Sequence, residues 1–156
     1  MSDADADIDA LTAALRHLVH GWERFRHVIA AELHISISEV IALGHITDRG
    51  RVTPRELAAL MHLTSGSITA LLDRLEAAAF IGRIQNPGDK RSVLISARPA
   101  GRHAAGWMHD QSSNSVAEAL AASGNSKADE LIPAVEAITR GLIAQADRLA
   151  SQIGSQ

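Results

Sequence analysis

The chain has 156 residues, enough for one domain with an apolar core, and 46% of them are hydrophobic. Alanine and leucine are abundant, which favours helices. The absence of cysteine excludes disulfide bonds, thiolate zinc sites and redox sensing through thiols.

The net charge of −3 is unevenly distributed along the chain. Residues 49–102 carry nine basic and four acidic side chains, whereas the rest of the chain carries six basic and fourteen acidic ones. A basic lobe on an acidic frame is typical of a protein that binds phosphate, although a simply solvated surface can show the same counts. A phosphate-binding motif is therefore expected within residues 49–102.

No apolar run approaches the length of a membrane span, and the acidic N-terminus predicts no signal peptide. We expect a cytoplasmic protein with no membrane partner.

The first predicted helix carries apolar residues at helical spacing: Leu11, Leu15, Leu18, Trp22, Phe25, Ile29 and Leu33. The acidic residues 1–7 before it are expected to be frayed. A helix of about six turns cannot bury such a stripe alone. It therefore needs other helices, from the same chain or from a second copy of it.

Two capping boxes predict the next two helix starts. Ser36 and Glu39 form the first, which begins a helix that runs to about Thr47. Thr53 and Glu56 form the second, and Pro54 suits the first position of that short helix. Residues 62–64 then make a turn, and a further helix begins at residue 64 or 65. The two helices and their turn predict a helix-turn-helix motif.

In the second helix of this motif, Ile68, Leu71, Leu72 and Leu75 share one face and should pack inward. The opposite face carries Ser65, Ser67, Thr69 and Arg74. Small hydroxyl side chains at a helix N-terminus allow close approach to phosphate and base edges. Taken one at a time, the same hydroxyls would serve to cap and solvate a surface helix.

Residues 80–85 and 92–96 read as two strands joined by the turn Asn86-Pro87-Gly88-Asp89. Lys90 and Arg91 follow the turn directly. Beside a helix-turn-helix, a hairpin with a basic tip is suited to enter a minor groove. We call this hairpin the wing.

Helices resume at Pro99, and a last helix, predicted to be capped by Ser126, carries Leu131, Val135, Ile138, Leu142, Leu149 and Ile153 near heptad spacing. We predict a mainly α protein with a small β-hairpin wing. It forms a single domain over 1–156, in which a winged helix-turn-helix lobe (36–98) is joined to a helical dimerisation frame (8–35 and 99–153).

Four segments resemble the MarR family of bacterial transcription regulators: TPRELA at 53–58, ITALLDRLE at 68–76, NPGDKRS at 86–92 and PAGR at 99–102, together with Arg83. The resemblance covers residues 36–102 by motif and the whole chain by helix order. It implies a homodimer that binds a short pseudo-palindrome in double-stranded DNA. It also implies repression, and release of DNA when a small-molecule effector binds between lobe and frame. No cofactor is implied.

Carried over by position, the resemblance makes Ser65, Ser67 and Thr69 candidates for the major groove. Arg91 becomes the candidate for the minor groove, with Lys90 beside it and Asp89 orienting it through a charge-assisted hydrogen bond. Arg74 is either a phosphate contact or one half of an internal ion pair.

The chain departs from the family pattern after the second helix of the motif, where Ala79 replaces the usual glycine of a left-handed cap.

Three other functions compete with this hypothesis. Catalysis is not expected, because no nucleophile motif or phosphate loop is present. A zinc-responsive regulator is the main alternative, with His17, His20, Glu23 and His27 near one face of the first helix, although Arg24 on that face would repel a cation. A pure protein-interaction module would bind no DNA.

An effector pocket is predicted near Trp22, Phe25 and His45, where aromatic and polar groups can meet. The alternative role is packing, which the position of Trp22 and Phe25 on the apolar stripe favours.

Overall fold

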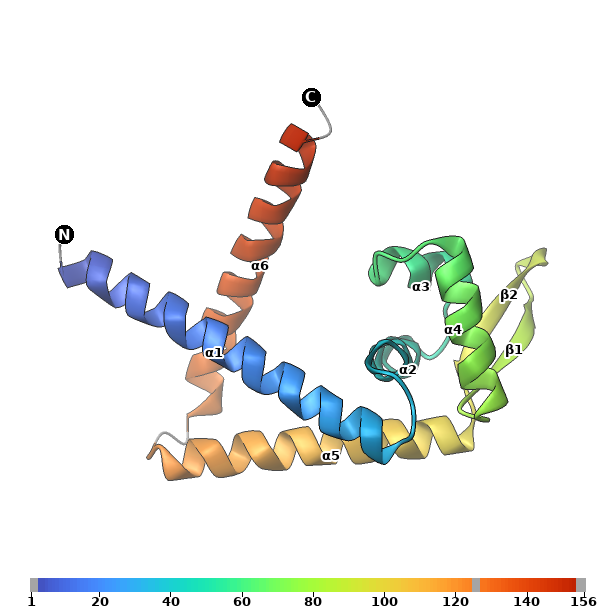
Figure 1. Ribbon diagram of the computed structural model, residues 1–156, viewed down its shortest axis with the longest axis horizontal. Helices are drawn as coiled ribbons and strands as arrows, with labels where there is room; N and C mark the ends of the chain where they lie inside the picture. Colours follow the sequence, from blue (N-terminus) through green and yellow to red (C-terminus); the bar gives the residue numbers. More distant parts are fainter. Residues whose placement is uncertain (1–2, 125–126, 154–156) are drawn as a thin grey trace. The chain divides into compact units, whose positions relative to one another are not determined.

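The computed structural model describes residues 3–124 and 127–153, including every side chain in these ranges except that of Lys90. The elements in chain order are α1 (Asp3–Glu32), α2 (Ile37–Arg49), α3 (Pro54–Leu60), α4 (Ser65–Ala77), β1 (Ile81–Asn86), β2 (Asp89–Ala97), α5 (Pro99–Ala122) and α6 (Ala128–Ile153) (Figure 1). The predicted fold class, mainly helical with one small hairpin, is confirmed.

The chain forms two compact units, Met1–His109 and Asp110–Gln156. The boundary between them falls within α5, so the first unit holds α1 to β2 and the first part of α5. The second unit holds the rest of α5 and α6. The helix-turn-helix and the wing therefore share one unit, whose core fixes their positions.

The main core of the first unit lies among α2, α3, α4 and the hairpin. Its buried members are Ala42, Leu43, Ile46, Val52, Leu57, Ile68, Leu71, Leu72, Leu75, Ile81, Ile95 and Ala104. A smaller cluster around Ile29, Ala30 and Val40 holds the end of α1 against α2. The inward face predicted for α4 is confirmed, because all four of its apolar residues are buried.

The predicted helix starts are confirmed at α2 and α3, where both capping boxes form with Ser36 and Thr53 as N-caps. The expectation of a frayed N-terminus is wrong for residues 3–7, which belong to α1. Asp3 and Asp5 lie in its first turn, where a carboxylate interacts favourably with the positive end of the helix dipole.

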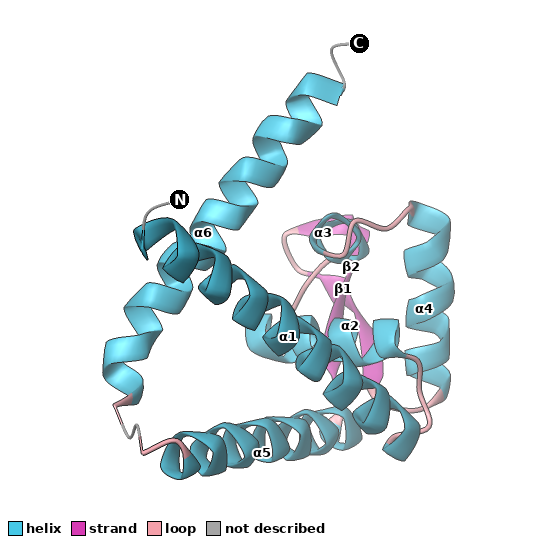
Figure 2. Cartoon of the chain, turned by 60° about the vertical axis from the view of Figure 1, so that its left-hand side comes forward, coloured by secondary structure: helices cyan, strands magenta, loops and turns pink. Residues whose placement is uncertain are grey.

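The hairpin is antiparallel, with Ile81 opposite Ala97 and Gln85 opposite Val93. It begins one residue later than predicted, because Phe80 stays outside β1, and β2 extends back to Asp89. Val52 forms a single bridge with Ile95, so the loop between α2 and α3 also pairs with β2. Figures 1 and 2 both place the hairpin beside α4, which contacts β1.

In the second unit, α6 contains no buried residue. Its exposed large apolar side chains are Leu131, Ile132, Val135, Leu142, Ile143, Leu149 and Ile153. The predicted cap Ser126 lies outside the described residues. Among the described residues of the second unit, nothing covers this apolar face.

Candidate nucleic-acid interface

The recognition helix of the motif is α4, which follows α3 after a four-residue turn. His62 takes a left-handed conformation in this turn, with φ of 52°. Thr64 caps α4 by accepting a hydrogen bond from the Ser67 backbone N–H. The first turn of α4 is exposed on its outer side, so its backbone and hydroxyls are accessible to a ligand.

Ser65, Ser67 and Thr69, the predicted major-groove contacts, are all exposed near the N-terminus of α4. Thr69 Oγ1 donates to the Ser65 carbonyl at 2.8 Å, and Ser67 Oγ lies 2.9 Å from Thr64 Oγ1. Each hydroxyl oxygen keeps acceptor capacity beyond these local bonds. The arrangement can therefore accept hydrogen bonds from base edges without a cation on the reading face.

Arg74 forms an internal ion pair in the structure. Its Nε donates to Glu39 Oε1, and Glu39 is the buried charged residue of α2, with 4% of its surface exposed. The second carboxylate oxygen of Glu39 accepts from the Ser36 backbone N–H at 2.8 Å. One buried carboxylate thus joins the start of α2 to the recognition helix.

Arg83 on β1 forms a second link to α4. Its guanidinium donates to Asp73 Oδ1 and to Glu76 Oε2, both at 2.6 Å. This fork-shaped contact fixes the base of the wing against the recognition helix. Arg83 is part of the family pattern in the sequence, but no role was predicted for it. The acidic pair in the DRLE segment, one turn apart, was the signal that could have identified its partners.

The tip of the wing is closed by its own hydrogen bonds. Asn86 Oδ1 accepts from the Gly88 backbone at 3.0 Å, and Asn86 Nδ2 donates to Ser92 Oγ at 2.9 Å. Asp89 was expected to bond the guanidinium of Arg91, but the structure records its carboxylate accepting from the Arg91 backbone N–H at 3.0 Å. Arg91 is exposed, and the side chain of Lys90 lies outside the described part of the chain.

The MarR family profile matches residues 35–93. The chain is 30% identical over 109 residues to the multiple antibiotic resistance protein MarR of Salmonella typhimurium, which covers 70% of this chain and 74% of that protein. The chain belongs to the MarR family. It is therefore a DNA-binding transcriptional regulator.

Other MarR-like proteins extend the match. An HTH-type transcriptional regulator of Mycobacterium bovis is 28% identical over 137 residues, covering 87% of this chain and 93% of that protein. A MarR family protein from Bacillus stearothermophilus has the same fold, with a TM-score of 0.71 at 22% identity, over 94% of this chain and 98% of that one. A mutant MarR from E. coli, solved in complex with operator DNA, aligns with a TM-score of 0.63 at 24% identity, over 90% and 99% of the two chains. The named relatives are regulators rather than enzymes.

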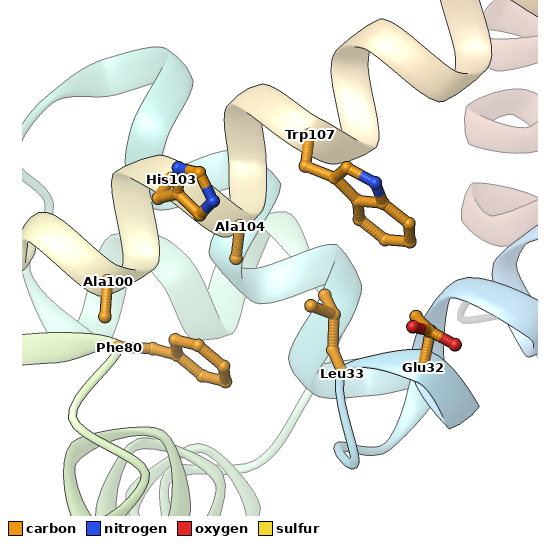
Figure 3. A pocket seen from close by; sticks show the side chains of 7 residues that line it. All are labelled: Glu32, Leu33, Phe80, Ala100, His103, Ala104 and Trp107. Carbon is orange, nitrogen blue, oxygen red and sulfur yellow. The ribbon is translucent and has the colours of Figure 1, made fainter.

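This MarR-family chain has a pocket within its first unit, with a volume of about 360 Å³. Figure 3 shows Leu33, Phe80, Ala104 and Trp107 facing a common space. Ala100, His103 and Glu32 complete the lining. The walls come from α1, from the junction of α4 and β1, and from α5, which are distant in sequence.

The predicted effector residues lie elsewhere. The rings of Trp22 and Phe25 pack against each other, with centroids 5.7 Å apart, and Phe25 contacts the small core cluster of α1 and α2. His45 is half-buried on α2. None of the three lines the pocket of Figure 3.

The structure gives no support to the zinc alternative for this MarR-family chain. Among residues 3–124 and 127–153, no group of three or more His, Cys, Asp or Glu side chains could hold a metal ion. His20 instead lies 3.5 Å from Glu23 as an exposed pair.

No single helix within the described ranges has the length and apolarity to cross a membrane. The α1–α2 pair reaches that level only when both helices are taken together across a 92° bend.

Proposed function

We propose that the protein is a dimeric repressor that binds a pseudo-palindromic operator and leaves it when a small-molecule effector occupies the pocket of Figure 3. The observation that carries the proposal is the exposed hydroxyl face of α4, formed by Ser65, Ser67 and Thr69 and held beside the wing. Arg91, and Lys90 next to it in sequence, supply cations at the tip of the wing. In this proposal α4 enters the major groove and the wing enters the adjacent minor groove.

Dimerisation is supported by apolar surface that a single unit leaves uncovered. On α6, Leu142 and Ile143 are 65% and 58% exposed, and on α1, Ile8 and Leu18 are about equally exposed. Exposed apolar side chains gathered on one helix are typical of protein–protein interfaces. Two copies related by a two-fold axis would present two recognition helices to two half-sites one helical turn apart.

The effector site is supported by the volume and lining of the pocket. About 360 Å³ suits a small aromatic molecule, because ligand pockets begin near 300 Å³. Leu33, Phe80 and Trp107 offer apolar contacts, and His103 and Glu32 offer polar ones. The chemical class that fits is an aromatic ring with a hydroxyl or carboxylate group.

Phe80 connects the pocket to the DNA-binding elements. Its backbone N–H donates to the Leu75 carbonyl of α4, and its own carbonyl accepts from Arg98 at the start of α5. A ligand that displaces the Phe80 side chain would therefore act at the point where α4, β1 and α5 meet. This is the proposed route from effector to release of DNA.

The experiment is selection of DNA fragments by the purified protein, followed by titration of the selected operator in the presence of phenolic ligands. The expected result is an inverted repeat with two half-sites, bound by two chains and released by at least one ligand. Selection of no sequence would contradict operator binding, and a bound monomer would contradict the dimer. Release that persists unchanged in Trp107→Ala would contradict the assignment of the pocket.

A further inference from the structure

Arg74 looks like a phosphate contact by position, because it lies on the recognition helix and 59% of its side chain is exposed. Its contacts indicate a different role. The Nε atom is directed to Glu39, whose side chain is only 5% exposed. A buried carboxylate cannot follow an arginine to a new partner, so Glu39 determines where Arg74 points.

Glu39 is itself fixed by the fold. It closes the capping box of α2, where Ser36 Oγ accepts from the Glu39 backbone and Glu39 Oε2 accepts from the Ser36 backbone. The capping box lies only three residues beyond Leu33, a wall of the pocket. The position of the carboxylate is thus set by the corner between α1 and α2 and not by α4.

Removing the arginine would leave a charge buried without a counter-ion, which is far more costly than losing an exposed ion pair. The protein can relieve that cost by moving α4, by admitting water to Glu39 or by protonating Glu39. In each case the ion pair that fixes α4 against the start of α2 is lost, and with it the constraint on the angle at which Ser65, Ser67 and Thr69 are presented.

We propose that Arg74 is a positioning residue, which acts through Glu39 to fix the recognition helix against the start of α2 and makes no phosphate contact. This inference rests on the proposed role of α4 in the major groove. It predicts that the reading face of α4 is uncharged and that its orientation depends on a carboxylate buried beneath it.

The test measures operator affinity across a salt series for Arg74→Gln, Glu39→Gln and the double variant. A phosphate contact and a positioning residue differ in the slope of log affinity against log salt, since each lost phosphate contact lowers that slope by about one. For a positioning residue, both single variants lose affinity by about tenfold, the typical size of an indirect effect, with the slope unchanged.

The double variant and a conservative variant supply further readouts. Because the two residues act as one unit, the loss in the double variant should be no greater than in either single variant. Arg74→Lys should recover part of the affinity, because it restores the positive charge beside Glu39. Arg91→Ala serves as the matched control and should lower the slope.

Each outcome decides the question. A lower slope in Arg74→Gln, or full affinity in Glu39→Gln, would overturn the inference. If Glu39→Gln does not fold, the slope of Arg74→Gln decides alone. If the unsubstituted protein selects no operator, the proposed function fails and not this assignment.

Discussion

At the level of single residues, the guanidinium groups of Arg74 and Arg83 differ from that of Arg91 in what they touch. Arg74 and Arg83 are held by carboxylates of the same unit, and Arg91 is exposed next to the turn of the wing. A cation with a fixed internal partner stabilises the lobe, and a cation without one can release counter-ions from DNA. The basic side chains of residues 49–102 thus include two arginines held in internal ion pairs and one exposed arginine that suits the proposed DNA contact.

Arg91→Ala is expected to weaken operator binding by about 1–3 kcal/mol and to make the salt dependence shallower, because one phosphate or groove contact is lost. Fluorescence anisotropy across a salt series measures both quantities. Arg148→Ala on α6 removes the same charge far from the wing in sequence and should leave both unchanged. An unaltered affinity at every salt concentration in Arg91→Ala would refute the role of the wing.

Ala79 takes a left-handed conformation, with φ of 61°, two residues after the end of α4. Left-handed geometry costs a residue with a Cβ roughly 1–2 kcal/mol, and glycine avoids that strain. Ala79→Gly should therefore raise the free energy of unfolding by about 1 kcal/mol, as measured by urea denaturation.

The neighbouring alanine provides a control for Ala79→Gly. Ala78 has φ of −76°, an ordinary value for a residue with a Cβ. Ala78→Gly should be neutral or destabilising, because glycine only adds freedom to the unfolded chain there. Equal effects of the two substitutions would show that strain at residue 79 is not the cause.

Glu39 makes stability depend on pH. Burial raises its pKa, but the Ser36 backbone hydrogen bond and the Arg74 guanidinium outweigh burial, and the pKa lies below the ordinary value of 4.5. A carboxylate whose pKa is lower in the folded protein than in the unfolded chain stabilises the fold at pH values above its unfolded-state pKa. This stabilisation is lost as the pH falls through the folded-state pKa.

We therefore expect Glu39→Gln to be less stable than the unsubstituted protein at neutral pH, with a difference that shrinks as pH falls below 4.5. Urea denaturation of both proteins at stepped pH measures it. The two proteins differ only at residue 39, so the comparison isolates the contribution of Glu39. A difference that stays constant into acid would contradict the assignment.

At the level of elements, the first turn of α5 packs directly on backbone. A Cβ at Gly101 would lie 2.0 Å from the Phe80 carbonyl oxygen, closer than any contact between these atoms allows. Glycine is therefore required where α5 crosses the junction of α4 and β1. The same close approach holds Phe80 at the edge of the pocket.

Gly101→Ala should destabilise the first unit by about 1–3 kcal/mol, because the helix must shift to relieve the overlap. Gly106→Ala, five residues later in the same helix and facing open space, should instead stabilise it by about 0.5–1 kcal/mol. Thermal unfolding of both variants measures the contrast. A Gly101→Ala protein as stable as Gly106→Ala would rule out the close packing.

Local signals in the sequence predicted the helix starts and the inward face of α4. Ser36 and Thr53 act within four residues, so their capping boxes can be recognised without knowledge of the fold. The same holds for the turn at Asn86, where the side chain bonds the backbone two residues later.

Contacts between distant segments could not be predicted from the sequence. The Glu39–Arg74 pair joins residues 35 apart, and nothing local distinguishes Glu39 from an exposed capping glutamate such as Glu56. The pocket likewise depends on Phe80 and Trp107 meeting Leu33, which the packing of three elements decides. Ala79 stands where the family pattern has the glycine of a left-handed cap, and the backbone adopts the left-handed conformation at this alanine.

At the level of the whole molecule, the proposed dimer depends on the exposed apolar face of α6. Leu142→Arg places a charge on its exposed apolar face and should shift the protein to monomers, because a charge buried in an apolar interface is costly. Sedimentation velocity measures the change, and operator affinity should fall with it.

Ala144→Glu is the matched control for Leu142→Arg. It adds a charge two residues away, about 200° around the same helix, and should leave the dimer intact. Dissociation by both variants, or by neither, would contradict the placement of the interface on the Leu142 face.

The closed tip of the wing has a consequence for the temperature dependence of binding. Asn86, Asp89 and Ser92 already bond one another and the local backbone in the free protein. A loop that is ordered beforehand loses little conformational entropy when it meets a partner, and association needs no coupled folding step. Calorimetry of operator binding at several temperatures should therefore give a heat-capacity change no larger than the surface buried between protein and DNA accounts for.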